Sequence, residues 1–146
     1  MFGRNKHTLN SRWIAYYMDI AERTSELSYA EKLKVGCVIV RDNRILSIGY
    51  NGTPSGWSNV CEKDGKSKPE VLHAEANALM KLAKSTETSE QAILFITHEP
   101  CIECAKLIYQ AGITTIYYKN KYTASKGSGL DFLNKAGVKV LWQNEP

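Results

Sequence analysis

The sequence lacks the features that would place it in a membrane or outside the cell. No apolar run among its 146 residues approaches the length of about 20 residues that a transmembrane helix needs. The opening stretch MFGRNKHTLN contains no apolar core of the kind found in a signal peptide. We therefore expect an intracellular, cytoplasmic protein with no membrane partner.

A strong excess of one charge is also missing. The sequence has 19 Lys and Arg against 15 Asp and Glu, which gives a formal net charge of +4. This charge suits an anionic small molecule or a nucleic acid and does not choose between them. We find no internal repeat, low-complexity tract or interdomain linker, so we expect one domain over residues 1–146. A chain of this size can bury a core without disulfide support.

The sequence has only 4 cysteines, and we expect no disulfide framework, because such a framework is uncommon in a reducing compartment and unnecessary at this size. Cys101 and Cys104 form a C-x-x-C pair, for which metal binding and redox chemistry are both open interpretations. Cys61 stands in a polar stretch without an obvious partner. A second metal site that combines Cys61 with His7 or His98 is a further alternative.

Apolar periodicity divides the chain into alternating helices and strands. The stretch KVGCVIVRDNRILSIGY contains two strands joined by Asp42-Asn43, which are typical residues of a hairpin turn. Residues 51–69 are rich in Gly, Ser, Pro and Lys and are expected to form a long irregular loop. The expected helices are 9–27, 73–84, 101–111 and 130–136, and the expected strands are 35–40, 45–50, 92–97, 113–118 and 138–142. A hairpin followed by β-α-β units predicts an α/β fold, with one mixed sheet between helices.

Two stretches, LHAEANALM and EPCIECAK, place metal-binding residue types where helices are expected to begin. His73 and Glu75 open one helix, and Cys101 and Cys104 lie in the first turn of the next. Residues three apart on a helix face the same side, and a helix N-terminus favours thiolates. One imidazole and two thiolates form a three-ligand zinc site with the open fourth position that a catalytic zinc needs. Glu75 is then the expected general base, close to the metal without binding it.

Other interpretations of these residues explain less of the pattern. A structural zinc site needs a fourth protein ligand, usually from a second C-x-x-C, which the sequence does not contain. Thioredoxin-like chemistry would place the C-x-x-C after the first strand and would leave His73 and Glu75 without a role. The combination of H-x-E with P-C-x-x-C matches the signature of zinc deaminases that act on nucleobases. We therefore favour a catalytic zinc.

Further motifs extend this match over most of the chain: KVGCVIV, GYNGTPSG, HAEANA, THEPCIECAKLIYQAGI and the pair Lys121-Tyr122. With them the sequence resembles the deoxycytidylate (dCMP) deaminases of the cytidine deaminase superfamily, in their compact bacterial or phage form. The resemblance implies a three-layer α/β/α sandwich with a five-stranded mixed sheet, and hydrolysis of dCMP to dUMP and ammonia. It also implies a homo-oligomer, expected to be a hexamer, activated by dCTP and inhibited by dTTP. A phage-encoded member would work in the host cytoplasm.

The sequence departs from this family in two places. Cys37 stands where many relatives have alanine, a small-for-small change at an expected core position. The loop between Gly56 and Leu72 is shorter than in some relatives, where an insertion carries additional zinc ligands. Cys61 alone cannot rebuild that second site.

The resemblance also implies roles around the expected zinc. The metal would activate water against C4 of cytosine, and Glu75 would carry protons from the water to N3 and to the departing ammonia. The expected substrate contacts are Asn51 at the sugar, together with His98, Pro100, Lys121 and Tyr122. As alternatives, Asn51 is a turn residue, His98 caps a strand, and the Lys-Tyr pair is a solvated loop.

The resemblance also implies an effector site for a nucleoside triphosphate near the GYNG segment, at subunit contacts. Its residues would be Lys34, Arg44, Gly49, Tyr50, Gly52 and Trp57, with Mg²⁺ bound to the phosphates. The glycines would let the backbone approach a ligand closely, and Trp57 would form an apolar wall. Lys34 and Arg44 would meet the phosphates, although surface charge without a partner is the alternative for both.

Three rival functions share parts of the pattern. A tRNA adenosine deaminase has the same zinc motif, but its C-terminal helix is expected to be rich in Arg and Lys. This chain closes on VLWQNEP instead, so we expect no nucleic-acid partner. A deaminase of free cytidine or guanine fits GYNGTPSG and the Lys-Tyr pair less well. A catalytically inactive nucleotide sensor would not need Glu75.

Overall fold

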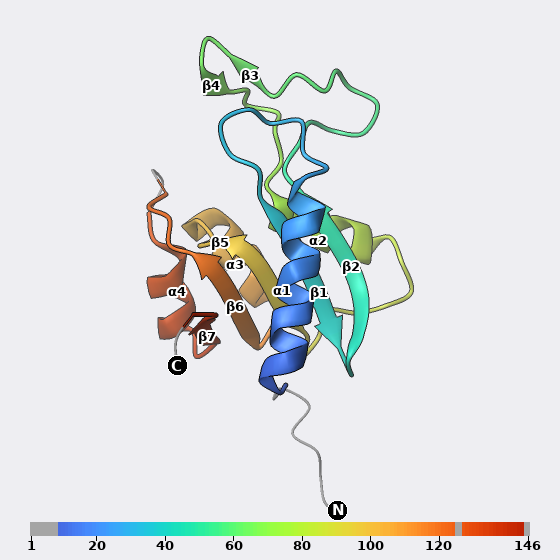
Figure 1. Ribbon diagram of the computed structural model, residues 1–146, viewed down its shortest axis with the longest axis vertical. Helices are drawn as coiled ribbons and strands as arrows, with labels where there is room; N and C mark the ends of the chain where they lie inside the picture. Colours follow the sequence, from blue (N-terminus) through green and yellow to red (C-terminus); the bar gives the residue numbers. More distant parts are fainter. Residues whose placement is uncertain (1–8, 125–126, 145–146) are drawn as a thin grey trace, which may run out of the picture.

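The computed structural model describes residues 9–124 and 127–144, which form a sheet with helices on both faces (Figure 1). The helices are α1 (Ser11–Ser25), α2 (Ala74–Ala83), α3 (Ile102–Gln110) and α4 (Gly129–Lys135). The strands of the sheet are β1 (Gly36–Arg41), β2 (Arg44–Tyr50), β5 (Ile93–His98), β6 (Thr115–Asn120) and β7 (Lys139–Trp142). Two short strands, β3 (Glu62–Lys63) and β4 (Lys66–Ser67), form a separate hairpin. Among the described residues, none of the helices combines the length and apolar character that a membrane crossing requires.

The five strands form a mixed sheet in the order β2-β1-β5-β6-β7. β1 pairs antiparallel with β2 and β5, while β5, β6 and β7 run parallel. Alternate residues of β1 enter different cores: Cys37 and Ile39 pack with α2 and α3, and Val38 and Val40 pack with α1. Because both faces are buried, the central strands are continuous apolar runs in the sequence. The expected α/β/α fold with a five-stranded mixed sheet is confirmed.

Gly49 allows α2 to lie directly against β2. A Cβ atom at this position would overlap the carbonyl oxygen of Ala74 and would lie 2.6 Å from the backbone nitrogen of Ala78. Any larger residue would therefore push the first turns of α2 away from the sheet. This contact fixes the start of α2, which is where His73 stands.

The β3–β4 hairpin is the largest difference from the elements expected from sequence. Residues 51–69 are expected to be irregular, yet Glu62 pairs with Ser67 across a turn at Asp64-Gly65. Both turn residues have positive φ, 55° and 76°, as a two-residue type I′ turn requires. Each strand has only two residues, which is too short to produce a recognisable alternation of apolar side chains.

Candidate metal centre and catalytic cleft

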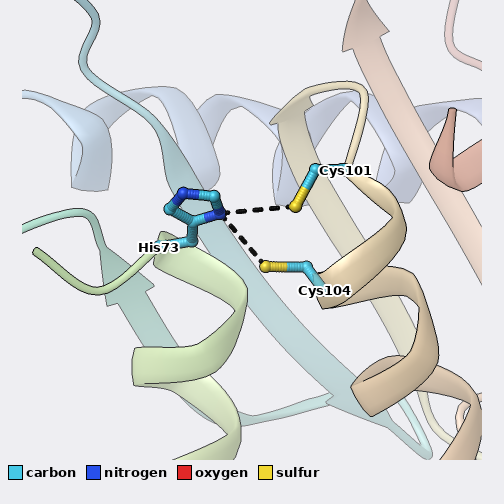
Figure 2. Close-up of side chains that lie close together, drawn as sticks. All are labelled: His73, Cys101 and Cys104. Carbon is cyan, nitrogen blue, oxygen red and sulfur yellow. Dashed lines mark hydrogen bonds between the residues drawn. The ribbon is translucent and has the colours of Figure 1, made fainter. Parts of the chain in front are cut away.

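His73, Cys101 and Cys104 converge at the starts of α2 and α3 (Figure 2). His73 is the N-cap residue of α2, Cys101 is the N-cap residue of α3, and Cys104 lies in the first turn of α3. The Nδ1 atom of His73 lies 3.2 Å from Sγ of Cys104 and 3.6 Å from Sγ of Cys101. The three donor atoms lie within 4.8 Å of one another, and residues 9–124 and 127–144 contain no second group of this kind.

These separations suit a tetrahedral zinc ion. With Zn–N distances of about 2.0 Å and Zn–S distances of about 2.3 Å, neighbouring nitrogen and sulfur donors of a tetrahedron lie roughly 3.6 Å apart. An imidazole and two thiolates are donors that zinc accepts readily. Three protein donors leave a fourth position for water or substrate. The residues present therefore fit a catalytic zinc.

The thiols of Cys101 and Cys104 are coupled through a hydrogen bond. This bond lowers the pKa of Cys101 to about 3, with help from His73 and against the opposing effect of burial. The same bond and burial raise the pKa of Cys104. One thiolate therefore forms readily in the metal-free protein, and a dication would displace the proton of the second thiol.

Glu75 lies in the first turn of α2 with 3% of its surface exposed. Burial raises the pKa of its carboxyl group to about 7, and a hydrogen bond to its own backbone amide and the charge of His73 oppose this only in part. A hydrogen bond with Cys104 places Glu75 beside the metal centre, although it is not one of the three clustered donors. A carboxyl group with a pKa near neutrality can both accept and release a proton, which is what general acid–base catalysis requires.

A cleft of about 660 Å³ opens at the metal centre. Glu75 and Cys101 lie in its lining, and its walls come from the segment before β1, from the β3–β4 region and from the segment after β6. Figure 1 shows the hairpin and the neighbouring loops projecting beyond one end of the sheet. The volume lies in the range of small-molecule sites in proteins. The residues that line its walls include Lys32, Asn51, Glu62, Lys68, His98 and Tyr122.

The residues expected to contact the substrate do not all reach this cleft. Asn51, His98 and Tyr122 line it. Pro100 is buried directly before Cys101, and its carbonyl oxygen accepts a hydrogen bond from the backbone N–H of Gly129. Lys121 is not part of the described lining, because its Nζ lies 4.4 Å from the ring centre of Trp142. Of the predicted Lys-Tyr pair, Tyr122 alone faces the cleft.

Asn51 has a structural role that the sequence interpretation does not include. Its Oδ1 accepts a hydrogen bond from the backbone N–H of Val35 (2.9 Å), and its Nδ2 donates to the carbonyl oxygen of Leu33 (2.8 Å). Both bonds hold the segment before β1 that forms one wall of the cleft. The amide group keeps one N–H and one acceptor lone pair beyond these two bonds, so a contact with a sugar stays a prediction.

The expected effector cations lie at opposite ends of the β1–β2 hairpin. Arg44 lies at the turn and its guanidinium contacts the carboxylate of Glu87 at 2.8 Å, whereas Lys34 precedes β1 near Tyr50 at the other end. The length of β1 separates these ends by roughly 16 Å. Lys34 and Arg44 of one chain therefore do not lie close together; Arg44 forms an ion pair with Glu87 at the turn, and an effector role for either residue stays a prediction.

The remaining residues of the expected effector site have clear local roles. Gly49 packs against α2, and Tyr50 ends β2. Gly52 and Leu72 exchange two backbone hydrogen bonds of 3.0 and 2.8 Å, which tie the segment after β2 to the segment before α2. Trp57 is 58% exposed. No contact here tests an effector role for these residues, and it stays a prediction.

Glu62, which lines the cleft, and Thr97, which contacts His98, are structural residues that the sequence analysis does not identify. The carboxylate of Glu62 accepts hydrogen bonds from the backbone N–H groups of Glu31 and Lys32, and so ties β3 to the opposite wall. Thr97 hydrogen-bonds the ring of His98. The Asp-Gly pair is a sequence signal for the β3–β4 hairpin that carries Glu62, whereas no sequence pattern indicates either contact.

Cys61 is buried and lies apart from the metal centre. Its thiol donates to the carbonyl oxygen of Asn59 at 3.5 Å. Among the described residues it belongs to no cluster of metal-binding side chains, so it forms no second site with His98. His7, the other partner considered from sequence, lies outside the described residues.

Comparisons with known proteins agree with this geometry. Residues 11–120 match the family model of the cytidine and deoxycytidylate deaminase zinc-binding region. The dCMP deaminase of the cyanophage S-TIM5, solved in complex with dCMP and dUMP, is 43% identical and superposes with a TM-score of 0.88. That match covers 92% of this chain and 99% of the cyanophage chain.

Two deoxycytidylate deaminases from eukaryotes are also similar. The Homo sapiens protein is 37% identical over 138 residues, which cover 86% of this chain and 76% of the human protein. The Schizosaccharomyces pombe protein is 32% identical over 93% of this chain, but the match covers only 45% of that longer protein. The resemblance inferred from the sequence motifs is thus confirmed, and the chain belongs to the cytidine and deoxycytidylate deaminase family.

Proposed function

We propose that this chain catalyses the zinc-dependent hydrolysis of dCMP to dUMP and ammonia, supplying dUMP for thymidylate synthesis. The observation that carries the proposal is the buried carboxyl group of Glu75, with a pKa near 7, beside a His/Cys/Cys cluster that suits zinc. The cyanophage relative, whose structure holds dCMP and dUMP, supports a deoxycytidine nucleotide as the substrate.

The reaction needs a nucleophile and a proton carrier at C4 of cytosine. Zinc held by His73, Cys101 and Cys104 would lower the pKa of water and supply the nucleophile. Glu75 accepts the proton that the water loses and delivers it to N3 of the ring. Glu75 then transfers the second water proton to the amino group, which leaves as ammonia. Burial keeps bulk water away from the carboxyl group and so preserves the raised pKa that this exchange needs.

The direct test follows ammonia release from dCMP, dCTP, cytidine, guanine and tRNA with the zinc-loaded protein. We expect release from dCMP, and loss of that release when a chelator removes the metal. Release from tRNA or guanine with none from dCMP would refute the proposed substrate. Protein that binds dCMP and zinc but releases no ammonia from any of the five would be the nucleotide sensor instead.

Regulation, assembly and location are finer proposals that rest on the family resemblance. We propose a hexamer whose dCMP saturation curve is sigmoidal, becomes hyperbolic with dCTP, and shifts to higher dCMP with dTTP, with Mg²⁺ accompanying the triphosphate. The cytoplasm is the expected compartment. A hyperbolic curve that neither triphosphate changes, measured on active hexameric protein, would refute the regulatory part.

A further inference from the structure

The hydroxyl group of Thr97 contacts two groups, and together they determine which atom accepts the hydroxyl proton. Thr97 is 2% exposed at the end of β5. Its Oγ1 accepts a hydrogen bond from the backbone N–H of Gly36 (3.1 Å) and lies 2.8 Å from Nδ1 of His98. The N–H of Gly36 can only donate, so the hydroxyl proton must find another acceptor. Among the described contacts of Thr97 Oγ1, Nδ1 of His98 is the acceptor, because a buried hydroxyl proton left without one is costly.

This arrangement sets the tautomer of His98. If Nδ1 accepts the Thr97 proton, the neutral ring carries its own proton on Nε2. Burial lowers the pKa of His98, while the charge of Glu22 opposes this effect, so the neutral ring is favoured. The ring lines the cleft and meets the ring of Tyr122 edge-on, with 6.3 Å between ring centres. His98 therefore faces the cleft as a fixed hydrogen-bond donor.

The position of His98 and Tyr122 indicates which part of a nucleotide they meet. The reacting C4 atom must lie at the metal centre, where Glu75, Cys101 and Cys104 are all buried. Tyr122 is 46% exposed, so its corner with His98 lies toward the solvent-facing part of the cleft. The phosphate is the charged end of the nucleotide, and it is least costly to place near solvent.

We propose that Thr97 fixes His98 as the Nε2–H tautomer, and that this preset donor binds the 5′-phosphate of the nucleotide substrate. The proposal rests on the proposed function, since it assumes a deoxycytidine nucleotide in the cleft. Thr97 is the positioning residue, and His98 is the specificity-determining one. A donor held in one tautomer loses little freedom when the phosphate binds, and a hydrogen bond to an ionised acceptor is stronger than a neutral one.

The tautomer is tested directly by ¹⁵N NMR of the zinc-loaded protein labelled at histidine. The chain has only 3 histidines, so a His98→Gln sample assigns the signals. We expect the His98 nitrogens to show an unprotonated Nδ1 and a protonated Nε2. Thr97→Val should give a mixture of tautomers, and Thr97→Ser should restore the wild-type signals. A wild-type protein with protonated Nδ1 would overturn the proposal, whether or not the protein deaminates dCMP.

The phosphate contact is tested by the ratio of kcat/KM for dCMP to kcat/KM for 2′-deoxycytidine, which lacks the phosphate. His98→Leu should lower the dCMP value roughly 10- to 100-fold, the range for a hydrogen bond to a charged group, and leave the nucleoside value nearly unchanged. His98→Gln keeps an N–H donor at about the same reach and should recover most of the loss. The inhibition constant of 2-deoxyribose 5-phosphate, a competitive inhibitor without a base, gives the same comparison between the wild type and the His98 variants.

Two results in this second test would count against the phosphate contact. An equal loss on dCMP and 2′-deoxycytidine would place His98 at the base or in the framework. Lys68 lines the cleft next to the β3–β4 hairpin, and a larger change in the ratio for Lys68→Gln than for His98→Leu would place the phosphate at the hairpin side. Wild-type protein that releases no ammonia from dCMP would refute the proposed function, a result distinct from either of these.

Discussion

Of the four helices in the part of the chain that the structure describes, two begin with ordinary N-caps and the other two begin at the metal centre. Asn10 Oδ1 accepts a hydrogen bond from a first-turn N–H of α1, and Ser128 Oγ does the same for α4. At the corresponding positions of α2 and α3 stand His73 and Cys101, and neither side chain makes a capping bond to its helix among the described contacts. The backbone does not explain the difference, because Asn10, His73 and Cys101 all have φ of −75° and ψ between 160° and 167°.

The comparison indicates that the residues of the metal centre lower the stability of the metal-free fold, and that bound zinc would restore this stability. A missing N-cap bond costs a helix about 1 kcal/mol, and α2 and α3 each lack one. Their first turns also hold the buried carboxyl group of Glu75 and the buried thiol of Cys104, whose raised pKa values make both groups costly to ionise in a metal-free protein. Zinc would hold the two helix starts together and compensate for both losses. We therefore expect α2 and α3, but not α1 and α4, to depend on the metal.

The largest expected effect comes from removing the metal. Cys104→Ser should abolish zinc binding and deaminase activity, because two remaining donors cannot hold the ion in its catalytic geometry. Zinc at about a hundred times its dissociation constant stabilises the folded state by about 3 kcal/mol, so the melting temperature should fall by roughly 5–10 °C. Metal analysis and calorimetry, with and without a chelator, measure both effects.

Cys61→Ser is the matched control for this variant, because Cys61 is also buried but lies outside the metal cluster. It should keep about one zinc per chain and the response to the chelator. Loss of zinc in the control, or full zinc content in Cys104→Ser, would contradict the assignment of the ligands.

Replacing Glu75 should separate catalysis from metal binding. Glu75→Gln should keep zinc and the fold but lower kcat by roughly 10²- to 10⁴-fold, the range for loss of general acid–base catalysis. Glu103 occupies the equivalent first turn of α3, where it is exposed and pairs with Lys106 at 2.8 Å. Glu103→Gln should therefore leave kcat unchanged. Near-normal turnover in Glu75→Gln would remove Glu75 from the mechanism.

The metal-free protein should lose stability as the pH rises through the range where Glu75 titrates. Burial raises the pKa of Glu75 from its ordinary value of 4.5 to about 7 in the folded protein, so the stability that this shift contributes is fully present below about pH 4.5 and lost as the pH rises through about 7. The loss is on the order of 3 kcal/mol. Urea unfolding of chelated wild type and Glu75→Gln from pH 5 to 8 should show the wild type losing stability relative to the variant. If the unfolding free energies of the two proteins changed with pH in parallel, the titration of Glu75 would not be the cause of the loss of stability.

The fold and the metal ligands could be predicted because their signals are local. A strand buried on both faces is a continuous apolar run, and a three-residue spacing of cysteines sets their directions on a helix. The side-chain contacts that the sequence does not indicate are of another kind. Arg44 and Lys121 are long, flexible cations whose partners, Glu87 and Trp142, come from distant parts of the sequence. The hydrogen bond from Thr97 to His98 depends on side-chain rotamers and on the neighbouring start of β1, which sequence spacing does not encode.

The smallest effect belongs to the ordinary cap of α1. Asn10→Ala removes the hydrogen bond from Asn10 Oδ1 to the N–H of Trp13 (3.1 Å) and should cost about 1 kcal/mol, or roughly 2–4 °C in melting temperature. Because α1 packs on the face of the sheet opposite α2 and α3, zinc content, kcat/KM for dCMP and the stabilisation by zinc should stay at wild-type values. Asn10→Asp keeps a capping oxygen and should restore the melting temperature, as calorimetry on the three proteins would show. If Asn10→Ala instead weakened zinc binding, the helix starts on the two faces would be coupled, and the distinction between capped and metal-held helices would fail.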